Sequence, residues 1–257
     1  MLVRTWNLFH GNTVPPHRHA YLAEMVELAG ADDPDVLCVQ EVPGWALPRF
    51  TAGDLAARPK LLSTELGRAV TDVNHGLLRS AVTGQGNGML VSPRLAVLGH
   101  ERLTLNPRRF RDRMARELGL SWRTRLAWAK ERRIVQSLRL RAEDGRTFLV
   151  ANLHCTSYDV DVRLAEAEAR RAAWFATSTA RPDDVVVLAG DFNLRPSSQA
   201  LQELTSDEWG FSAAGPGIDH VLVRGAAVSE TRVWPEERRR RDGRLLSDHA
   251  PVEVEIR

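Results

Sequence analysis

Residues 185–193 read VVVLAGDFN, and the rest of the chain is interpreted around this stretch. Its valine-rich start lies between Pro182 and Gly190, a pattern typical of a strand that is buried on both faces. Asp191 and Asn193 follow two residues apart, so in an extended segment their side chains point to the same side. The pattern predicts a strand that presents a carboxylate and a carboxamide at its end. The alternative is an ordinary turn before a helix, because Asp and Asn are common turn residues.

Comparable polar side chains occur at the ends of other predicted strands. The strand at residues 2–6 is followed by Asn7, and the strand at residues 35–40 is followed by Glu41. The other members of this set are Asn152, His154, Asp219, Asp248 and His249. Strands and helices alternate along much of the chain, which predicts an α/β fold in which strand ends meet.

The remaining periodic segments predict further elements. These are helices at residues 21–29, 159–177 and 198–204, a strand pair at 88–91 and 95–103, a hairpin at 134–140 and 147–152, and a last strand at 252–256. The strand pair is expected to turn at Ser92-Pro93. The long helix is expected to place Trp174 and Phe175 on its inner face. A further helix near residues 55–70 is suggested by a weaker pattern.

Positive charge is concentrated in one segment. Residues 108–133 contain ten Arg or Lys against three Asp or Glu, a local balance of +7 in a chain whose formal charge is +2. Gly119 predicts a break between two short helices. We interpret residues 106–132 as a basic helical insertion in a single domain that covers residues 1–257. Its surface could track phosphates and stack tryptophans on bases, or it could be a solvated helical face with a small apolar stripe.

Several features indicate a soluble cytoplasmic protein. Cys38 and Cys155 lie in apolar runs without metal-site spacing, which is typical of a reduced intracellular chain. Residues 1–6 lead directly into a strand and do not resemble a signal peptide. The chain contains no apolar run near the roughly 20 residues that span a bilayer. No obligate protein partner is inferred.

Oxygen donors dominate the polar set at the strand ends. Glu41 and Asp248, with Asn7 beside them, would form an open site for Mg²⁺, which prefers carboxylate and carbonyl oxygens. Mn²⁺ could substitute for it. The histidines occur with acids and without cysteine, which argues against a structural zinc site and favours histidines that bind or protonate an anionic substrate.

The order of these motifs resembles the endonuclease/exonuclease/phosphatase superfamily, which includes deoxyribonuclease I. The matching pieces are Trp6-Asn7, Gln40-Glu41, Asn152-Leu153-His154, Gly190-Asp191-Phe192-Asn193, Ile218-Asp219-His220 and Ser247-Asp248-His249. Each piece is weakly specific, but all six occur in the family's order over nearly the whole chain. The resemblance implies a four-layer α/β sandwich, in which two mixed β-sheets pack face to face and are flanked by helices.

The resemblance also implies roles for the matching residues. Glu41 would be the principal metal ligand, with Asn7 and Asp248 beside it. Asp191 would orient or deprotonate the attacking water, and Asn193 would hold a phosphate oxygen. These roles agree with in-line attack on a phosphodiester, which requires charge stabilisation on the non-bridging oxygens.

The histidines and their neighbours complete the implied site. His249, oriented by Asp219, would contact the phosphate and stabilise the transition state. His154 would be a second phosphate-binding or acid group, with Asn152 beside it as a substrate-binding residue. Two alternatives are simpler, because His154 could be a core histidine and Asn152 could satisfy only backbone groups. His220 is interpreted as structural.

Some features of the chain fall outside the matching motifs. Four consecutive positive charges are also predicted to bind substrate, and they are Arg238, Arg239, Arg240 and Arg241. Val42-Pro43 follows the glutamate where exonuclease III-type enzymes have Thr-Lys. Thr5-Trp6-Asn7 and Gln40-Glu41-Val42 are also similar to the 5′-tyrosyl-DNA phosphodiesterases, but such short matches recur across the superfamily. Glu65 and Asp72 are unsupported candidates for an acidic partner of the histidine, and His10 is notable because it lies three residues after Asn7.

The leading hypothesis is a Mg²⁺-dependent phosphodiester hydrolase, a nuclease that acts on DNA or RNA by in-line attack of an activated water. The second hypothesis keeps this chemistry on a small-molecule or lipid phosphoester, with the basic segment meeting an anionic head group. The third is a binding module that keeps the fold without catalysis.

Overall fold

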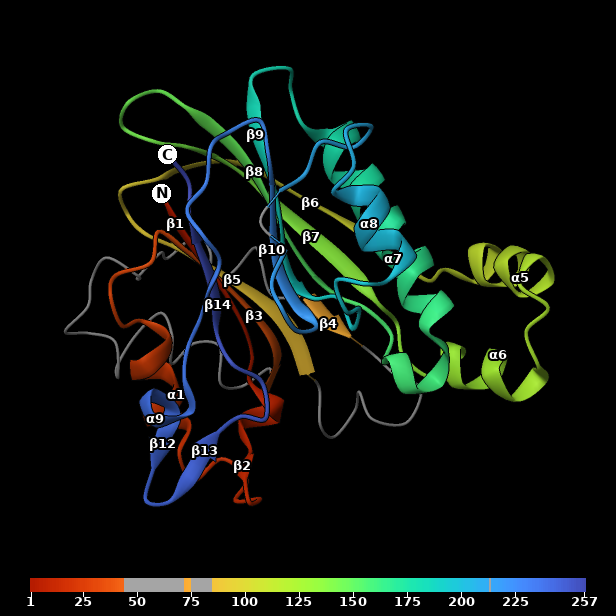
Figure 1. Cartoon of the computed structure of the whole chain (residues 1–257), viewed down its shortest axis with the longest axis horizontal. Helices are drawn as coiled ribbons and strands as arrows, with labels where there is room; N and C mark the ends of the chain where they lie inside the picture. The colour runs from red at the N-terminus through yellow and green to blue at the C-terminus, as the bar shows by residue number, and fades with distance from the viewer. Residues whose placement is uncertain (44–71, 75–84, 213) are drawn as a thin grey trace.

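The strands in the described part of the chain form two large sheets and one small sheet. The computed structural model describes residues 1–43, 72–74, 85–212 and 214–257, and the helix expected near residues 55–70 lies outside them. Figure 1 shows the two large sheets packed together, with helices on their outer faces. The predicted four-layer α/β sandwich is therefore confirmed.

The first large sheet has six strands in the order β11-β14-β1-β3-β5-β4. They are β1 (Leu2–Asn7), β3 (Val36–Pro43), β4 (Asp72–Asn74), β5 (Gln85–Val91), β11 (Arg232–Val233) and β14 (Val252–Glu255). β1 and β3 are parallel and are connected by helix α1 (Leu22–Ala29). Asn7 lies opposite Gln40 in their register. This pairing brings Asn7 and Glu41 to the same edge of the sheet.

The second large sheet has five strands in the order β10-β9-β8-β7-β6. They are β6 (Ala96–Thr104), β7 (Ile134–Arg141), β8 (Thr147–His154), β9 (Asp184–Asp191) and β10 (Asp219–Arg224). The helices α7 (Tyr158–Thr179) and α8 (Gln199–Leu204) cover its outer face (Figure 1). Asp191 pairs in register with both His154 and Asp219, so three polar residues stand side by side at one edge.

Strand β9 is buried on both faces, as its valine-rich sequence predicts. Val186 and Leu188 face the helices α7 and α8, whereas Val187 packs into the core between the two sheets. Gly190 follows with a φ of +147°, and a Cβ at this position would lie 2.0 Å from the carbonyl oxygen of Leu153. A glycine is therefore required where β8 and β9 bring their polar ends together.

Two expectations about local packing are wrong. β5 and β6 do not form a strand pair, because β5 pairs with β3 and β4 while β6 pairs with β7 in the other sheet. The chain crosses between the sheets near Ser92, since a local turn signal does not specify which strands will pair. Trp174 is also not on the inner face of its helix, because its side chain is 57% exposed, whereas Phe175 is buried as expected.

The remaining elements lie outside the two large sheets. They are the short 3-10 helix η1 (Phe9–Gly11), β2 (Thr13–Val14), α5 (Arg108–Glu117), α6 (Trp122–Ala129), α9 (Glu236–Arg239), β12 (Arg240–Arg241) and β13 (Arg244–Leu246). Gly119 separates α5 from α6 in a left-handed conformation, which confirms the predicted break. Among the described helices, none is long and apolar enough to cross a membrane.

Candidate active site

Eight of the predicted residues gather where the two large sheets meet at one edge. They are Asn7 at the end of β1, Glu41 in β3, His154 at the end of β8, Asp191 at the end of β9, Asn193 just after it, Asp219 at the start of β10, and Asp248 and His249 in the loop before β14. The contacts Asn7–Asp191, Glu41–His154 and Asp219–His249 each join one sheet to the other. Neither sheet alone carries the whole site.

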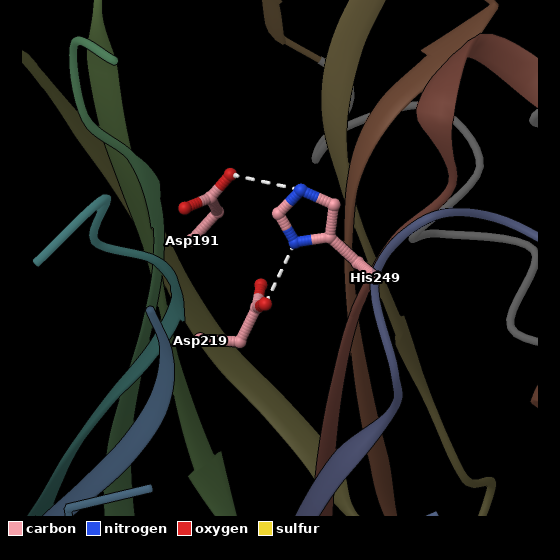
Figure 2. Close-up of side chains that lie close together, drawn as sticks. All are labelled: Asp191, Asp219 and His249. Atoms are coloured by element: carbon pink, nitrogen blue, oxygen red, sulfur yellow. Dashed lines mark hydrogen bonds and ion pairs between the residues drawn. The ribbon is translucent and has the colours of Figure 1, made fainter. Parts of the chain in front are cut away.

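His249 lies between two carboxylates that belong to the opposite sheet (Figure 2). Its Nδ1 is 2.7 Å from Oδ2 of Asp219, and its Nε2 is 4.0 Å from Oδ2 of Asp191. Burial lowers the pKa of His249, but the hydrogen bond and the negative charge of Asp219 outweigh it and raise the pKa to about 10. The imidazole is therefore a cation at neutral pH, with Nε2 directed towards Asp191.

Asp191 is a buried carboxylate held by two donors. Its Oδ2 accepts a 3.0 Å hydrogen bond from Nδ2 of Asn7, and its Oδ1 accepts a 2.9 Å bond from the backbone N–H of Asn193. Burial, together with the charge of Asp219, raises the pKa of Asp191 to about 7. A carboxylate with this pKa can accept a proton near neutral pH.

Glu41 has an unusual backbone in an otherwise regular strand. Its φ is +53°, and the register of β3 with β5 shifts between Val39 and Val42. This irregularity accompanies a 2.9 Å contact between Oε2 of Glu41 and Nε2 of His10. Burial raises the pKa of Glu41, but the His10 hydrogen bond and nearby histidine charge outweigh it and hold the pKa at about 2.

His154 differs from His249 although both belong to one site. Its Nε2 lies 3.5 Å from Oδ2 of Asp191 and 3.8 Å from Oε1 of Glu41. Burial, followed by the charge of Arg133, lowers the pKa of His154 well below its usual range. One neutral and one cationic imidazole therefore face the same carboxylate.

The last two residues of the set occupy different depths. Asn193 is buried with a φ of +52°, and its Nδ2 donates a 3.2 Å bond to the carbonyl oxygen of Cys155. Asp248 lies at the rim with its side chain 44% exposed, and its Oδ1 is 4.0 Å from Nε2 of His249. Burial nevertheless raises the pKa of Asp248, and the charge of Glu41 acts in the same direction.

A family model matches this arrangement of motifs. The model describes the endonuclease/exonuclease/phosphatase family, and it matches residues 5–249. The chain belongs to this family. Its members are hydrolytic, metal-dependent phosphoesterases, so the chain is an enzyme of this class. No protein of curated function matches the sequence significantly.

Solved structures with this fold cover the whole phosphoesterase chain. An endonuclease/exonuclease/phosphatase from Beutenbergia cavernae is 19% identical with a TM-score of 0.70, over 100% of this chain and 71% of that chain. TDP2 from D. rerio, complexed with a single-strand DNA product, is 14% identical with a TM-score of 0.68, over 100% and 98%. A mannosyl-6-phosphatase from Bacteroides thetaiotaomicron is 16% identical with a TM-score of 0.64, over 100% and 99%.

The sequence did not predict the positioning roles of three residues in the candidate site. Ser247 donates a 2.7 Å bond from Oγ to the carbonyl of Asn7 and accepts a 3.1 Å bond from the N–H of His249. Trp6 and Arg239 both donate to the carbonyl of His249, at 2.9 and 3.0 Å. These bonds attach the His249 loop to β1 and to α9. The motif Ser247-Asp248-His249 contains the serine, but no sequence signal reveals what its hydroxyl contacts.

Two further cationic or basic side chains were not assigned to the site from the sequence. His10 holds Glu41, and its position three residues after Asn7 was the one available signal. Arg133 is 8% exposed, and its Nη2 pairs with Glu131 at 2.6 Å. Its Nε and Nη1 are buried without a hydrogen-bond partner among the described residues. The charge of Arg133 acts on His154, so this guanidinium is close to the phosphoesterase site.

The predicted substrate-binding residues have hydrogen-bond partners within the fold. Asn152 donates to the carbonyls of Val39 and Gly88 and accepts from Gln40, which favours the alternative that it satisfies backbone groups. The four consecutive arginines at residues 238–241 have different partners. Arg239 is buried against the His249 loop, Arg238 pairs with Asp32, Arg240 pairs with Glu236, and Arg241 donates to backbone carbonyls.

Two other expectations concern His220 and the acidic partner of a histidine. His220 is buried with Nε2 2.7 Å from the carbonyl of Leu194, in agreement with a structural role. Glu65, one candidate for the acidic partner of a histidine, lies outside the described residues, as does the side chain of Asp72. The acids that the structure places beside His154 are Glu41 and Asp191.

Two groups of side chains could hold a cation. Ligand atoms of Asp191, Asp219 and His249 lie within 4.8 Å of one another. However, the raised pKa of His249 keeps its imidazole protonated at neutral pH, and a protonated imidazole does not ligate a metal ion. Glu41 and Asp248 fit a hard cation better, because they supply carboxylate oxygens and the charge of Glu41 disfavours ionisation of Asp248. A bound cation would relieve this repulsion.

Proposed function

We propose that the protein is a Mg²⁺-dependent phosphodiester hydrolase that acts on nucleic acid. The observation that carries this proposal is the pairing of Asp191, whose pKa is about 7, with the cationic imidazole of His249 at a distance of 4.0 Å. One group can accept a proton from water, and the other can stabilise negative charge on a phosphate oxygen. Hydrolysis of a phosphodiester requires both functions.

The residues of the chain can be assigned to successive parts of the reaction. Asp191 orients the attacking water and accepts its proton, since Asn7 and Asn193 fix the direction of its carboxylate. His249 contacts a non-bridging oxygen, and Asp219 holds its ring in place. Asn193 and neutral His154 lie beside Asp191 and contact the remaining phosphate oxygens. Charge that develops on the phosphate therefore meets groups that are already positioned.

Glu41, Asp248 and Asn7 would hold Mg²⁺, with Mn²⁺ able to replace it. Their donor atoms are oxygens, which Mg²⁺ prefers, and Asp248 opens to solvent so that waters can complete the coordination. When bound, the ion supplies Lewis-acid stabilisation of the phosphate and the leaving oxygen. The low pKa of Glu41 keeps this ligand ionised at any pH at which the enzyme would work.

Charge near the site supports a nucleic acid as substrate. The segment at residues 108–133 carries a balance of +7, and Arg133 at its end has two buried donors without a partner among the described residues. A polyanion gains from such a field along its whole length, whereas a small ester contacts only part of it. The related fold of D. rerio TDP2 is known with a single-strand DNA product, which is consistent with this substrate class.

A small phosphoester is the second candidate, and one observation favours it. A hollow of about 380 Å³ adjoins the site and is lined by Gly217, Asp219, Val233, Asp248 and His249. This volume could hold a sugar-sized group next to the phosphate position. The mannosyl-6-phosphatase from Bacteroides thetaiotaomicron has the same fold.

Hydrolysis assays with Mg²⁺ or Mn²⁺ test the proposal. Single- and double-stranded DNA, RNA and a panel of small phosphomonoesters and phosphodiesters are compared for wild type, Glu41→Ala and Asp191→Asn. Asp183→Asn removes an exposed carboxylate and is the matched control. We expect nucleic-acid cleavage that EDTA abolishes and that both site variants reduce by about a hundredfold or more, with the control unchanged.

The other outcomes are equally clear. Cleavage of small esters alone would replace the nucleic-acid substrate with the second candidate. Full activity of Glu41→Ala and Asp191→Asn would place the chemistry elsewhere in the molecule. No hydrolysis of any substrate with either ion would overturn the proposed function.

A further inference from the structure

Helices α5 and α6 form a projecting feature that the proposed chemistry does not use. Figure 1 shows them standing off the body of the molecule, beyond one end of α7. We call residues 108–129 the arginine arm. Hydrogen bonds join it to α7, since Arg163 donates to the carbonyl of Leu118 at 3.0 Å and Nε1 of Trp128 donates to Glu168 at 2.6 Å. The arm is therefore fixed against α7 and presents a defined surface.

A hollow of about 380 Å³ lies between the two helices of the arm. It is lined by Arg108, Arg111, Asp112, Trp122, Arg125 and Leu126, among others. Trp122 is 66% exposed, in contrast to Trp128, which is buried and cannot stack on a ligand. The hollow therefore offers one exposed indole beside several guanidinium groups.

Two of the three arginines that line this hollow are weakly engaged, whereas Arg111 donates a 2.6 Å bond to the carbonyl of Asn106. Asp112 is the acid that approaches them, at 3.8 Å from Arg108 and 3.7 Å from Arg125, and both distances exceed that of a good hydrogen bond. Arg108 and Arg125 are largely exposed, so such ion pairs contribute little. Arginines in this state remain available to an incoming anion.

A second hollow provides a direct comparison. It measures about 480 Å³ and is also lined by an exposed tryptophan, Trp174, with Arg170 and Arg171. Arg170 is bonded to Glu203 at 2.6 Å, and Arg171 donates to the carbonyl of Thr104 while packing over Phe110. Two of the three arginines of the second hollow are thus committed to the fold, whereas Arg113 is 59% exposed and lies 3.7 Å from Glu117. The first hollow has two such weakly paired arginines. The first hollow is the better anion site.

The chain path connects the arm to the candidate active site. After α6 the chain passes through Arg133 into β7, where Val135 pairs with Leu153. Leu153 immediately precedes His154, so the base of the arm adjoins the edge that carries the site. A polymer bound in the hollow could therefore extend towards the catalytic residues.

We propose that the hollow of the arginine arm binds a single-stranded segment of nucleic acid. Trp122 stacks on one base, and Arg108 and Arg125 contact neighbouring phosphates. A single strand is required because a base inside a duplex does not offer its face to a side chain. The inference rests on the proposed function for its substrate class, but it concerns binding and not hydrolysis. A membrane surface fits less well, because the indole and the arginines line a hollow between two helices.

Fluorescence anisotropy in EDTA tests this site without cleavage. The probes are fluorescent oligothymidylate, oligouridylate and a DNA hairpin duplex, and phosphatidylserine vesicles are used in a parallel sedimentation assay. The variants are Trp122→Ala and Arg125→Ala. Trp174→Ala is the matched control, because it removes an exposed tryptophan from the second hollow.

We expect single strands to bind more tightly than the duplex. Trp122→Ala should weaken their binding by about tenfold, which is the size expected when one stacked base is lost. Arg125→Ala should lower the slope of log affinity against log salt by about one, because one phosphate contact is lost. Trp174→Ala should bind as wild type does. Comparison of the two oligonucleotides then distinguishes DNA from RNA.

Other results would overturn the inference. These are no binding of single strands, equal affinities for wild type and Trp122→Ala, equal losses for Trp122→Ala and Trp174→Ala, or vesicle binding that depends on Trp122 while oligonucleotide binding does not. Because these assays contain no divalent cation, they report binding separately from catalysis. Intact binding here, together with no hydrolysis in the Mg²⁺ and Mn²⁺ assays, would refute the proposed function and leave this site standing.

Discussion

His154 and His249 occupy one site but carry different charges at neutral pH. His249 is paired with Asp219, which raises its pKa, whereas burial and the charge of Arg133 lower the pKa of His154. Both histidines lie near Asp191, so the difference comes from the burial of His154 and from the Asp219 partner of His249. A cationic and a neutral imidazole can therefore make different contacts with one phosphate.

Asp219 should act through His249 as a positioning residue. We expect Asp219→Asn to lower kcat by about a hundredfold, because the amide no longer holds the imidazolium in place. His249→Asn should cause a similar or larger loss. If Asp219 acts through His249, the double variant should be no worse than His249→Asn alone.

Steady-state kinetics of the four proteins in this cycle measure the coupling, and circular dichroism checks that each is folded. Losses that multiply in the double variant would show that Asp219 acts independently of His249.

At the scale of elements, parallel strand pairs determine which polar residues meet. β1 pairs with β3, and β8 pairs with β9, so residues that are far apart in the chain leave their strands at a common edge. Glu41 departs from this regular pattern. Its positive φ and the irregular register of β3 direct its side chain towards His10 and His154.

Glu168 connects three elements through one buried carboxylate. Its oxygens accept bonds from Nε1 of Trp128 in α6 at 2.6 Å, and from the N–H and Oγ1 of Thr156 at 2.6 and 2.9 Å. Thr156 lies two residues after His154. The arginine arm, helix α7 and the segment after β8 therefore share a single polar anchor.

Replacement of Glu168 should destabilise the protein strongly. Glu168→Ala leaves three buried donors of Trp128 and Thr156 without their acceptor, and we expect a loss of about 3 kcal/mol or more in the free energy of unfolding. Urea denaturation measures this loss. Glu117→Ala removes an exposed glutamate from the same arm and should change the stability by less than about 0.5 kcal/mol. Equal effects of the two variants would show that Glu168 is not an anchor.

At the scale of the whole molecule, Asn152 is a polar link between the two large sheets. It extends from β8 in the second sheet to the carbonyls of Val39 and Gly88 in the first, at 3.1 and 2.8 Å, and it accepts from Gln40 at 2.7 Å. These bonds use both atoms of the carboxamide. The link lies just below the catalytic edge and fixes how the sheets pack there.

Asn152→Ala should therefore reduce stability and leave substrate binding unchanged. We expect a loss of about 2 kcal/mol or more in the free energy of unfolding, because two buried carbonyls and one amide lose their partner. The KM of the folded variant should equal that of wild type. Thermal unfolding and steady-state kinetics check both statements. Asn193→Ala is the matched control, because it also removes a carboxamide but should lower kcat/KM. A wild-type melting temperature with a raised KM would restore the substrate-binding role.

The sequence by itself determined the architecture and predicted eight residues that the structure places close together in the candidate site. Strand β9 is identifiable because five consecutive apolar residues end at a glycine, and the six ordered motifs indicate which strand ends carry chemistry. The same reasoning failed for the β5–β6 pair and for Trp174. Local patterns report periodicity, but they do not report which strand or helix will become the neighbour.

The tertiary structure alone decided the partners, the charges and the orientation of side chains. It pairs His10 with Glu41 and Ser247 with Asn7, and it assigns Asn152 to the link between the sheets. It also separates the exposed Trp122 from the buried Trp128. These properties depend on groups that approach across two sheets and from distant segments. Hydrogen bonding and burial act only after folding has brought those groups together, so a linear pattern could not reveal them.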